Sequence, residues 1–222
     1  MKLTGNSFSG IPLIGILGGT FNPIHFGHLR MAQELAEALS LDEVRFIPSA
    51  NPPHKNQPTV SAAHRAEMVQ LAIADNSLFK CDTRELARSG ASYTIDTLIS
   101  LRDELGENVA LCLIMGSDAF TKLDSWHRWN ELLNYCHIIL VQRPNYKAEK
   151  ISDQLTAFLS AHYSENMDDL SEKSAGYIHM QAITAQDISA TNIREKLAAG
   201  KSAQYLAPDF IVKYIKKNSL YQ

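Results

Sequence analysis

The stretch GGTFNPIHFGHLRMA, residues 18–32, decides how the rest of the chain is interpreted. It follows an apolar run at residues 13–17 and leads into a helical stripe of apolar residues that begins near Gly27. Glycines let a chain turn sharply and let a ligand come close to the backbone. The free N–H groups at the start of the helix would face the same turn and attract phosphate. The stretch therefore predicts a strand, a phosphate-binding turn and a helix.

The order of the apolar runs along the chain predicts an α/β fold. Further short runs indicate strands at residues 44–47, 78–81, 109–115, 138–141 and 177–183, and helical patterns occupy residues 62–74, 93–105, 190–199 and 208–217. Alternating strands and helices form a mostly parallel sheet with both faces covered, so we expect a doubly wound α/β fold with C-terminal helices. We expect one domain over residues 1–222, with a C-terminal helical part from about residue 188. The polar stretch 145–174 should hold a surface helix and a loop.

Composition narrows the class of protein. The chain has 222 residues and a formal net charge of −3, whereas a nucleic-acid-binding protein would more often be basic, so we expect no nucleic-acid partner. No apolar run is long enough to span a membrane, and polar residues and glycines interrupt the N-terminal stretch. We therefore expect a cytoplasmic protein without membrane contact, and a homo-oligomer is compatible with the sequence. The three cysteines include no close pair, which disfavours disulfides and a thiolate zinc site.

His25 and His28 stand three residues apart, and the residue pattern alone leaves two interpretations open. In the first turn of a helix the two side chains would share one face. Otherwise they are incidental polar residues beside a glycine turn. A zinc site is disfavoured because no third ligand is evident. The dinucleotide fingerprint G-x-G-x-x-G and the P-loop motif are both absent, which disfavours a dehydrogenase and a P-loop enzyme.

Residues 18–29 closely resemble the His-x-Gly-His segment of the nucleotidyltransferase superfamily, which usually reads GGTFDPIHxGH. Four later segments resemble bacterial nicotinate-nucleotide adenylyltransferases: PSANPPHK at 48–55 followed by His64-Arg65, SYTIDTL at 92–98, MGSDAF at 115–120 with Trp126 after it, and ISATNIR at 188–194. The resemblance extends over nearly the whole chain. Asn22 replaces the usual Asp, and Ala190 replaces the second Ser of the last motif. An amide keeps the acceptor oxygen but loses the charge, so we expect Asn22 to form the turn and not to act as an essential carboxylate.

The resemblance implies a Rossmann-like nucleotidyltransferase fold and a reaction of NAD biosynthesis. In that reaction ATP gives its adenylyl group to nicotinate mononucleotide, and the products are nicotinate adenine dinucleotide and pyrophosphate. The acceptor phosphate would attack the α-phosphorus in line, without a covalent intermediate. His25 and His28 would donate hydrogen bonds to the ATP phosphates. Magnesium would accompany ATP with mostly water as its other ligands, so no protein ligand for a metal is expected.

The ATP half of the implied site lies where strands of a sheet of order 3-2-1-4-5 end. The resemblance assigns ATP binding to Gly18, Gly19, Thr20, Phe21, Gly27, Gly116, Asp118, Ser189, Thr191 and Arg194. Asp118 would contact the ribose, cap the next helix, or do both. Ser189 would cap the helix at 190–199, and Thr191 and Arg194 would bind the outer phosphates. A solvated Arg194 is the alternative.

The acceptor half of the implied site takes residues from three segments. The resemblance assigns it to Asn51, His54, Lys55, Tyr93, Thr94, Ile95 and Trp126. Backbone N–H groups at residues 93–95 would select the nicotinate carboxylate. Trp126 would stack on the pyridine ring or pack in the core against Trp129 and Phe120. His54 and Lys55 would meet the acceptor phosphate or be solvated.

Several alternatives to this function remain at the level of sequence. The closest is an adenylyltransferase that prefers nicotinamide mononucleotide or accepts both mononucleotides. Another His-x-Gly-His transferase, which uses pantetheine phosphate or a cytidylyl donor, is less compatible with the segments at 51–55 and 93–97 and with Trp126. A regulator that binds nucleotides on the same fold without turnover belongs to a different class. The presence of both histidines and of the segment 188–194 speaks against it.

Overall fold

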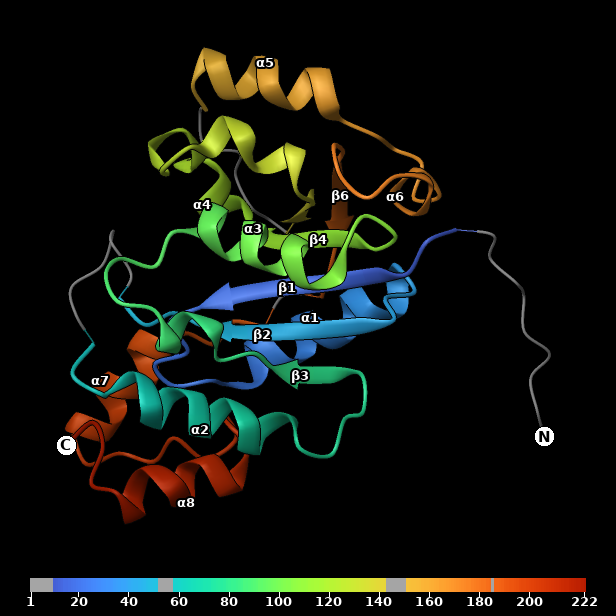
Figure 1. Ribbon diagram of the computed structural model, residues 1–222. Helices are drawn as coiled ribbons and strands as arrows, with labels where there is room; N and C mark the ends of the chain where they lie inside the picture. Colours follow the sequence, from blue (N-terminus) through green and yellow to red (C-terminus); the bar gives the residue numbers. More distant parts are fainter. Residues whose placement is uncertain (1–9, 52–57, 143–150, 185) are drawn as a thin grey trace, which may run out of the picture.

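The computed structural model describes residues 10–51, 58–142, 151–184 and 186–222. Its centre is a sheet of six strands in the order β3-β2-β1-β4-β5-β6 (Figure 1). The strands are β1 (Leu13–Gly19), β2 (Glu43–Pro48), β3 (Phe79–Cys81), β4 (Ala110–Gly116), β5 (His137–Gln142) and β6 (Ile178–Ala182). Each neighbouring pair is parallel. The expected parallel sheet and its order 3-2-1-4-5 are confirmed, and β6 extends the sheet beside β5.

Helices connect successive strands. The longer ones are α1 (Phe26–Ala38), α2 (Ala62–Ile73), α3 (Thr94–Leu105), α5 (Asp153–His162), α7 (Ala190–Ala198) and α8 (Asp209–Lys217). The shorter ones are α4 (Ser117–Phe120), α6 (Asp169–Glu172) and the 3-10 helices η1 (Arg84–Ala87), η2 (Leu123–Ser125) and η3 (Trp129–Asn134). The longer helices agree with the expected ranges within a few residues. The 3-10 helices were not expected, because each is too short to show a helical period in the sequence.

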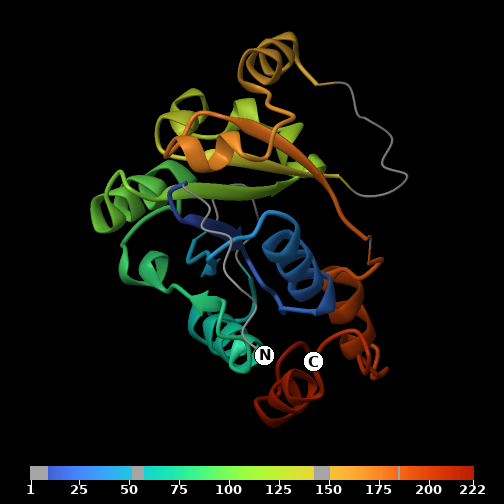
Figure 2. The ribbon, with the colours of Figure 1, turned by 90° about the vertical axis from the view of Figure 1, so that its right-hand side faces the viewer.

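Alternate side chains of the strands bury two cores, one on each face of the sheet. In β4, Leu111 and Leu113 pack with residues of α3, whereas Cys112 and Ile114 pack with residues of α1, α2 and α8. Figures 1 and 2 show the sheet between these two groups of helices. A parallel sheet buried on both faces needs near-continuous apolar strands, which is what β4 provides with its sequence ALCLIMG. The buried Cys112 is core filler, as its apolar surroundings in the sequence indicated.

The parallel direction of the strands gathers their carboxyl ends at one edge of the sheet. In Figure 1 the arrowheads of β1 and β2 point to the side where α7 lies. Central β1 pairs with β2 on one side and with β4 on the other, so the turns that follow these three strands are neighbours. Ligands of such sheets bind beyond the carboxyl ends of the strands. In the part of the chain that the structure describes, no helix combines the length and apolar character needed to cross a membrane.

Candidate active site

The turn after β1 carries both histidines to this edge. Gly18 and Gly19 end the strand, and His25 is the extended residue that precedes the first residue of α1. Phe21 has a φ of 45° and is buried, and its ring meets the ring of His28 edge-on at 5.1 Å. A ligand at this turn would therefore meet the backbone of Phe21 and not its ring. The buried ring instead fixes the turn to the core below it.

His25 and His28 lie against each other. Their ring centroids are 3.8 Å apart with planes 30° from parallel, so the two side chains do share one face. Gly27 makes this arrangement possible. A Cβ atom at Gly27 would lie 3.0 Å from two atoms of the His25 ring and 3.4 Å from the carbonyl oxygen of Ile188. The glycine therefore admits the ring of His25 and the approach of the chain that leads into α7.

The start of α7 lies against the same turn, although it is far away in the sequence. Ser189 caps the helix as expected, since its hydroxyl accepts a hydrogen bond of 3.2 Å from the N–H of Asn192. Arg194 donates from Nη1 to the carbonyl oxygen of Asn22 at 2.8 Å and from Nη2 to the hydroxyl of Thr191 at 3.2 Å. Arg194 is thus half-buried and bound to the turn, and is not a freely solvated side chain on an exposed face. Figure 2 shows α7, in orange-red, next to α1, in blue.

The end of β4 contributes Gly116 and Asp118. Gly116, not Asp118, is the N-cap residue of α4, so the capping interpretation of Asp118 is wrong. Asp118 is exposed, and a Cβ atom at Gly116 would lie 2.7 Å from its Oδ1. The glycine therefore leaves room for the carboxylate beside the strand end. Ser117 anchors this segment by donating to the carbonyl oxygen of Val141 in β5.

Two loops that hold assigned acceptor residues are joined by hydrogen bonds. Asn51, after β2, donates from Nδ2 to the carbonyl oxygen of Gly90 at 3.0 Å and accepts from the N–H of Ser92 at 3.0 Å. Tyr93 follows directly and is the N-cap residue of α3, with its ring 4.5 Å from that of His127. This contact brings the start of α3 next to the segment that contains Trp126. His54 and Lys55 lie outside the described residues.

Two assigned acceptor residues have side chains packed in the core on the α3 face. Ile95 is fully buried there, so only its backbone can meet a ligand. Trp126 is partly buried and packs against the same core. Helix geometry leaves the first N–H groups of α3 without acceptors inside the helix. The start of α3 can therefore present N–H groups to an anion.

Arg65 is a site-forming residue that the sequence interpretation left without a role. Its side chain is 1% exposed, and its guanidinium donates to the carbonyl oxygens of Thr20 at 2.6 Å, Val60 at 3.3 Å and Ala50 at 3.4 Å. Burial lowers the pKa of Arg65, yet an arginine stays charged near neutral pH. One buried cation from α2 therefore ties the turn after β1 to the loop after β2.

Glu85 is a second buried ionisable group near the acceptor loops. Its Oε1 accepts a hydrogen bond of 2.8 Å from the hydroxyl of Thr97, which also accepts from Arg88 at 3.0 Å. Burial raises the pKa of Glu85, although hydrogen bonds from Thr97 and Ser92 oppose the shift. Ser92 belongs to the loop that is joined to Asn51. Glu85 is therefore a buried hydrogen-bond partner of the loop before α3 and of α3 itself.

The described residues contain no group of three or more His, Cys, Asp or Glu side chains that could hold a metal ion. A metal at this site would need most of its ligands from a bound molecule and from water.

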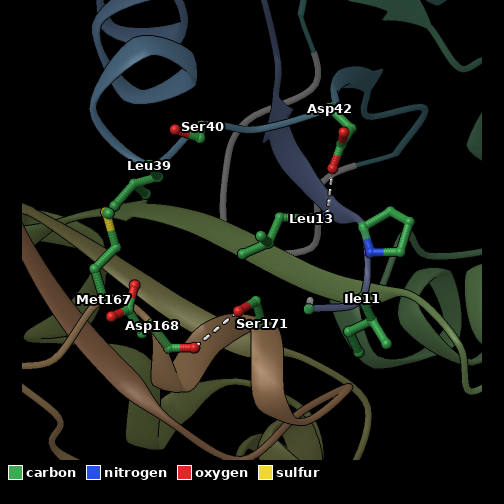
Figure 3. A pocket seen from close by; sticks show the side chains of 10 residues that line it. Ile11, Leu13, Leu39, Ser40, Asp42, Met167, Asp168 and Ser171 are labelled. Carbon is green, nitrogen blue, oxygen red and sulfur yellow. Dashed lines mark hydrogen bonds between the residues drawn. The ribbon is translucent and has the colours of Figure 1, made fainter. Parts of the chain in front are cut away.

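A cavity of about 450 Å³ lies elsewhere, at the edge where β1 begins (Figure 3). Its lining includes Leu13, Asp42 and Ser171. It lies at the amino ends of the strands and is separate from the edge that carries the histidines.

Comparison with known proteins covers almost the whole chain. The cytidylyltransferase-like family model matches residues 16–196. A protein of Pseudomonas entomophila named "Probable nicotinate-nucleotide adenylyltransferase" is 49% identical over 209 residues, which are 94% of each chain. A relative of the same name from Aeromonas salmonicida is 44% identical over 94% of this chain and 97% of its own. The fold is similar to that of Plasmodium falciparum nicotinic acid mononucleotide adenylyltransferase complexed with NaAD, with a TM-score of 0.70 at 19% identity over 95% of this chain and 97% of that chain.

The raised pKa of Glu85 predicts a particular pH dependence of stability. The folded protein holds this proton more tightly than the unfolded chain does, so the contribution of Glu85 to the free energy of unfolding should fall as pH rises from 4.5, the ordinary pKa of a glutamate, to the raised value in the fold. Glu85→Gln has no ionisable carboxyl group at this position and therefore lacks this pH-dependent contribution. In urea titrations across that range, the stability of Glu85→Gln relative to wild type should increase with pH and then level off.

Glu104→Gln is the matched control for this experiment. Hydrogen bonding to Arg84 lowers the pKa of Glu104, so its contribution is present at neutral pH and is lost as pH falls through the lowered pKa. The relative stability of Glu104→Gln should therefore change below pH 4.5, where it should decrease as pH rises, and it should stay nearly level over the range in which Glu85→Gln changes. A Glu85→Gln difference that stays constant with pH would contradict the assignment of Glu85 as a destabilised buried carboxylate.

Proposed function

The chain belongs to the cytidylyltransferase-like family and, within it, to the nicotinate-nucleotide adenylyltransferases, and from that membership we propose that it transfers the adenylyl group of ATP to nicotinate mononucleotide. The products are nicotinate adenine dinucleotide and pyrophosphate, so the reaction belongs to NAD biosynthesis. One observation carries the proposal: the two histidine rings lie 3.8 Å apart at the carboxyl end of the central strand, with Arg194 bonded to the same turn. Two imidazole rings and a guanidinium group so close together suit the binding of a polyphosphate.

The chemistry requires positioning and no proton abstraction. The nucleophile is the phosphate of the mononucleotide, which is already ionised at neutral pH. The protein has to align this oxygen with the α-phosphorus and to stabilise the charge on the phosphoryl oxygens in the transition state. His25 and His28 serve as hydrogen-bond donors to the ATP phosphates. Donors fixed by a buried turn need little reorganisation when the charge develops.

The other ATP contacts surround these histidines. The exposed Gly18 has open space beside it, which supports a close approach of the nucleotide to the backbone. We assign the ATP half-site to Gly18, Gly19, Thr20, Phe21, Gly27, Gly116, Asp118, Ser189, Thr191 and Arg194. In this assignment Asp118 accepts hydrogen bonds from the ribose. The free N–H groups at the start of α7 bind the outer phosphates, together with Thr191 and Arg194.

The position of Arg194 supports the assignment of an anion there. A cation near the amino end of a helix opposes the helix dipole, and two hydrogen bonds hold Arg194 in this place. A phosphate next to the guanidinium would remove that conflict. It would also interact favourably with the N–H groups at the start of α7.

The acceptor half-site combines the joined loops and the start of α3. We assign it to Asn51, His54, Lys55, Tyr93, Thr94, Ile95 and Trp126. The N–H groups at residues 93–95 bind the nicotinate carboxylate, and Trp126 stacks on the pyridine ring. Support comes from the contact between Tyr93 and His127, because it brings the proposed carboxylate site next to the proposed stacking residue.

Magnesium enters this proposal together with ATP. The described residues offer no cluster of three side-chain ligands, and Asp118 is an exposed carboxylate at the end of β4. This donor set suits an ion that takes phosphate oxygens and water as ligands. When bound, magnesium would neutralise part of the phosphate charge. The residues of the chain would still align the two substrates.

The histidines should be needed for turnover and not for folding. His28→Ala should lower kcat for dinucleotide formation by about 10²- to 10³-fold, because it removes one donor to the transition state. His25→Ala should act in the same direction. The measurement is coupled detection of pyrophosphate, with thermal unfolding to show that the variants stay folded.

His162→Ala is the matched control for these variants. His162 lies in α5, far along the chain from the turn, and also makes a hydrogen bond, to the carbonyl oxygen of Gly176. This variant should keep the wild-type kcat. Near-normal turnover of both His25→Ala and His28→Ala would refute the proposed role of the pair.

The proposed carboxylate site predicts which mononucleotide is used. Nicotinate mononucleotide should exceed nicotinamide mononucleotide in kcat/KM by on the order of 10²-fold, because the amide would turn an NH₂ group towards N–H donors and leave buried groups unpaired. Steady-state kinetics with both acceptors measures the ratio. Trp126→Ala should raise KM for both and leave the ratio unchanged, since stacking depends on the ring. Comparable kcat/KM values in the wild-type enzyme would favour dual specificity instead.

A further inference from the structure

The segment after α8 returns to the turn after β1. The helix ends at Lys217, and the N–H of Leu220 donates to the carbonyl oxygen of Ile215. Ser219 and Tyr221 then have φ values of 52° and 64°, in the left-handed region that L-residues seldom occupy. Such a conformation persists only where surrounding contacts hold it. In Figure 1 the end of the chain lies beside α7, on the side to which the arrowhead of β1 points.

A hydrogen bond to Asn22 ties the end of this segment to the turn. The hydroxyl of Tyr221 donates to Oδ1 of Asn22 at 2.7 Å, across 199 residues of sequence. The ring of Tyr221 packs against the core on the α1 face. Burial raises the pKa of Tyr221, so its hydroxyl keeps its proton at neutral pH and remains a donor. Asn22 needs only an acceptor oxygen for this bond, which explains why an amide can stand in the place where the related motif has a carboxylate.

Both oxygens of Asn22 are therefore held from outside the turn. Arg194 binds its backbone carbonyl, and Tyr221 binds its side chain. Three residues further on, His25 begins the step into α1, and its ring lies against His28. A shift of Asn22 would move the start of α1 and with it both rings. Displacement of donors by a fraction of an ångström is enough to weaken a positioned site.

From these contacts we propose that Tyr221 is a positioning residue of the ATP half-site, which fixes the Asn22 turn and thereby the placement of His25 and His28. The inference rests on the proposed function of that half-site. Tyr221 acts through Asn22 and does not touch the substrates. Its loss should therefore change the response to ATP and leave the response to nicotinate mononucleotide intact.

The test compares Tyr221→Phe with Tyr214→Phe. Tyr214 also lies in the last part of the chain and is also partly buried, and its hydroxyl is 2.8 Å from Nδ1 of His64 in α2, not bonded to Asn22. Each variant loses one hydroxyl and keeps its ring. Tyr221→Phe should lower kcat/KM for ATP on the order of tenfold, because a half-buried acceptor of the turn loses its partner. The KM for nicotinate mononucleotide should stay at the wild-type value, and Tyr214→Phe should keep wild-type kinetics.

A double-mutant cycle shows whether Tyr221 acts through Asn22. Asn22→Ala and Tyr221→Phe remove the same hydrogen bond, so the double variant should be no slower than the slower single variant. Asn22→Asp keeps an acceptor oxygen and should retain most of the activity. Multiplicative effects in the double variant would overturn the proposal. So would equal kinetics of Tyr221→Phe and Tyr214→Phe, or an equal loss towards both substrates.

Calorimetric titration with ATP separates this inference from the proposed function. If the wild-type protein binds ATP but forms no dinucleotide, the proposed reaction is wrong, and the positioning role then depends on binding alone. In that case Tyr221→Phe should still bind ATP about tenfold more weakly than Tyr214→Phe does. Equal affinities, or a wild-type protein that does not bind ATP, would overturn the role of Tyr221.

Discussion

The carbonyl groups of the turn between β1 and α1 need hydrogen-bond partners, while the turn also holds a buried His25 against a half-buried His28 at the edge of the sheet. Buried carbonyl oxygens need hydrogen-bond partners, and this turn has no strand or helix of its own to provide them. Arg65 supplies the partner for Thr20, and Arg194 supplies the partner for Asn22. Tyr221 holds the side chain of Asn22. These three side chains come from α2, from α7 and from the segment after α8. They tie helices outside the sheet to the one turn that follows the central strand β1.

The sequence predicted what depends on local periodicity and spacing. Six apolar runs became six strands, and the longer helical patterns became helices, because burial on both faces of a parallel sheet leaves a continuous apolar signature. Ser189 could be predicted as a cap from its place before a helical pattern, and the structure confirms it. The spacing of His25 and His28 indicated that their side chains could lie together, and the rings do so, although His25 is the extended residue before α1 and not part of its first turn. Their roles towards ATP remain a proposal.

The side chains that hold the site in place could not all be predicted, because they make contacts between residues far apart in the sequence. The bond between Tyr221 and Asn22 joins residues 199 positions apart, and neither residue stands in a pattern that indicates the other. Arg65 did leave a signal: it occupies the buried stripe of α2 with Met68 and Val69, three and four residues later. An arginine at a core position must have buried partners, here three carbonyl oxygens. Glu85 gave no such signal, because it lies in a 3-10 helix too short to show which face is buried.

The central claim is that this edge of the sheet aligns two nucleotides for a single in-line displacement at the α-phosphorus of ATP. The stereochemistry of the reaction tests it most directly. ATP made chiral at the α-phosphorus with oxygen isotopes is converted with nicotinate mononucleotide, and the configuration at phosphorus in the dinucleotide is determined. One in-line displacement inverts that configuration, so the account predicts inversion with one pyrophosphate released per dinucleotide. Retention would require two displacements through a covalent intermediate and would contradict the account.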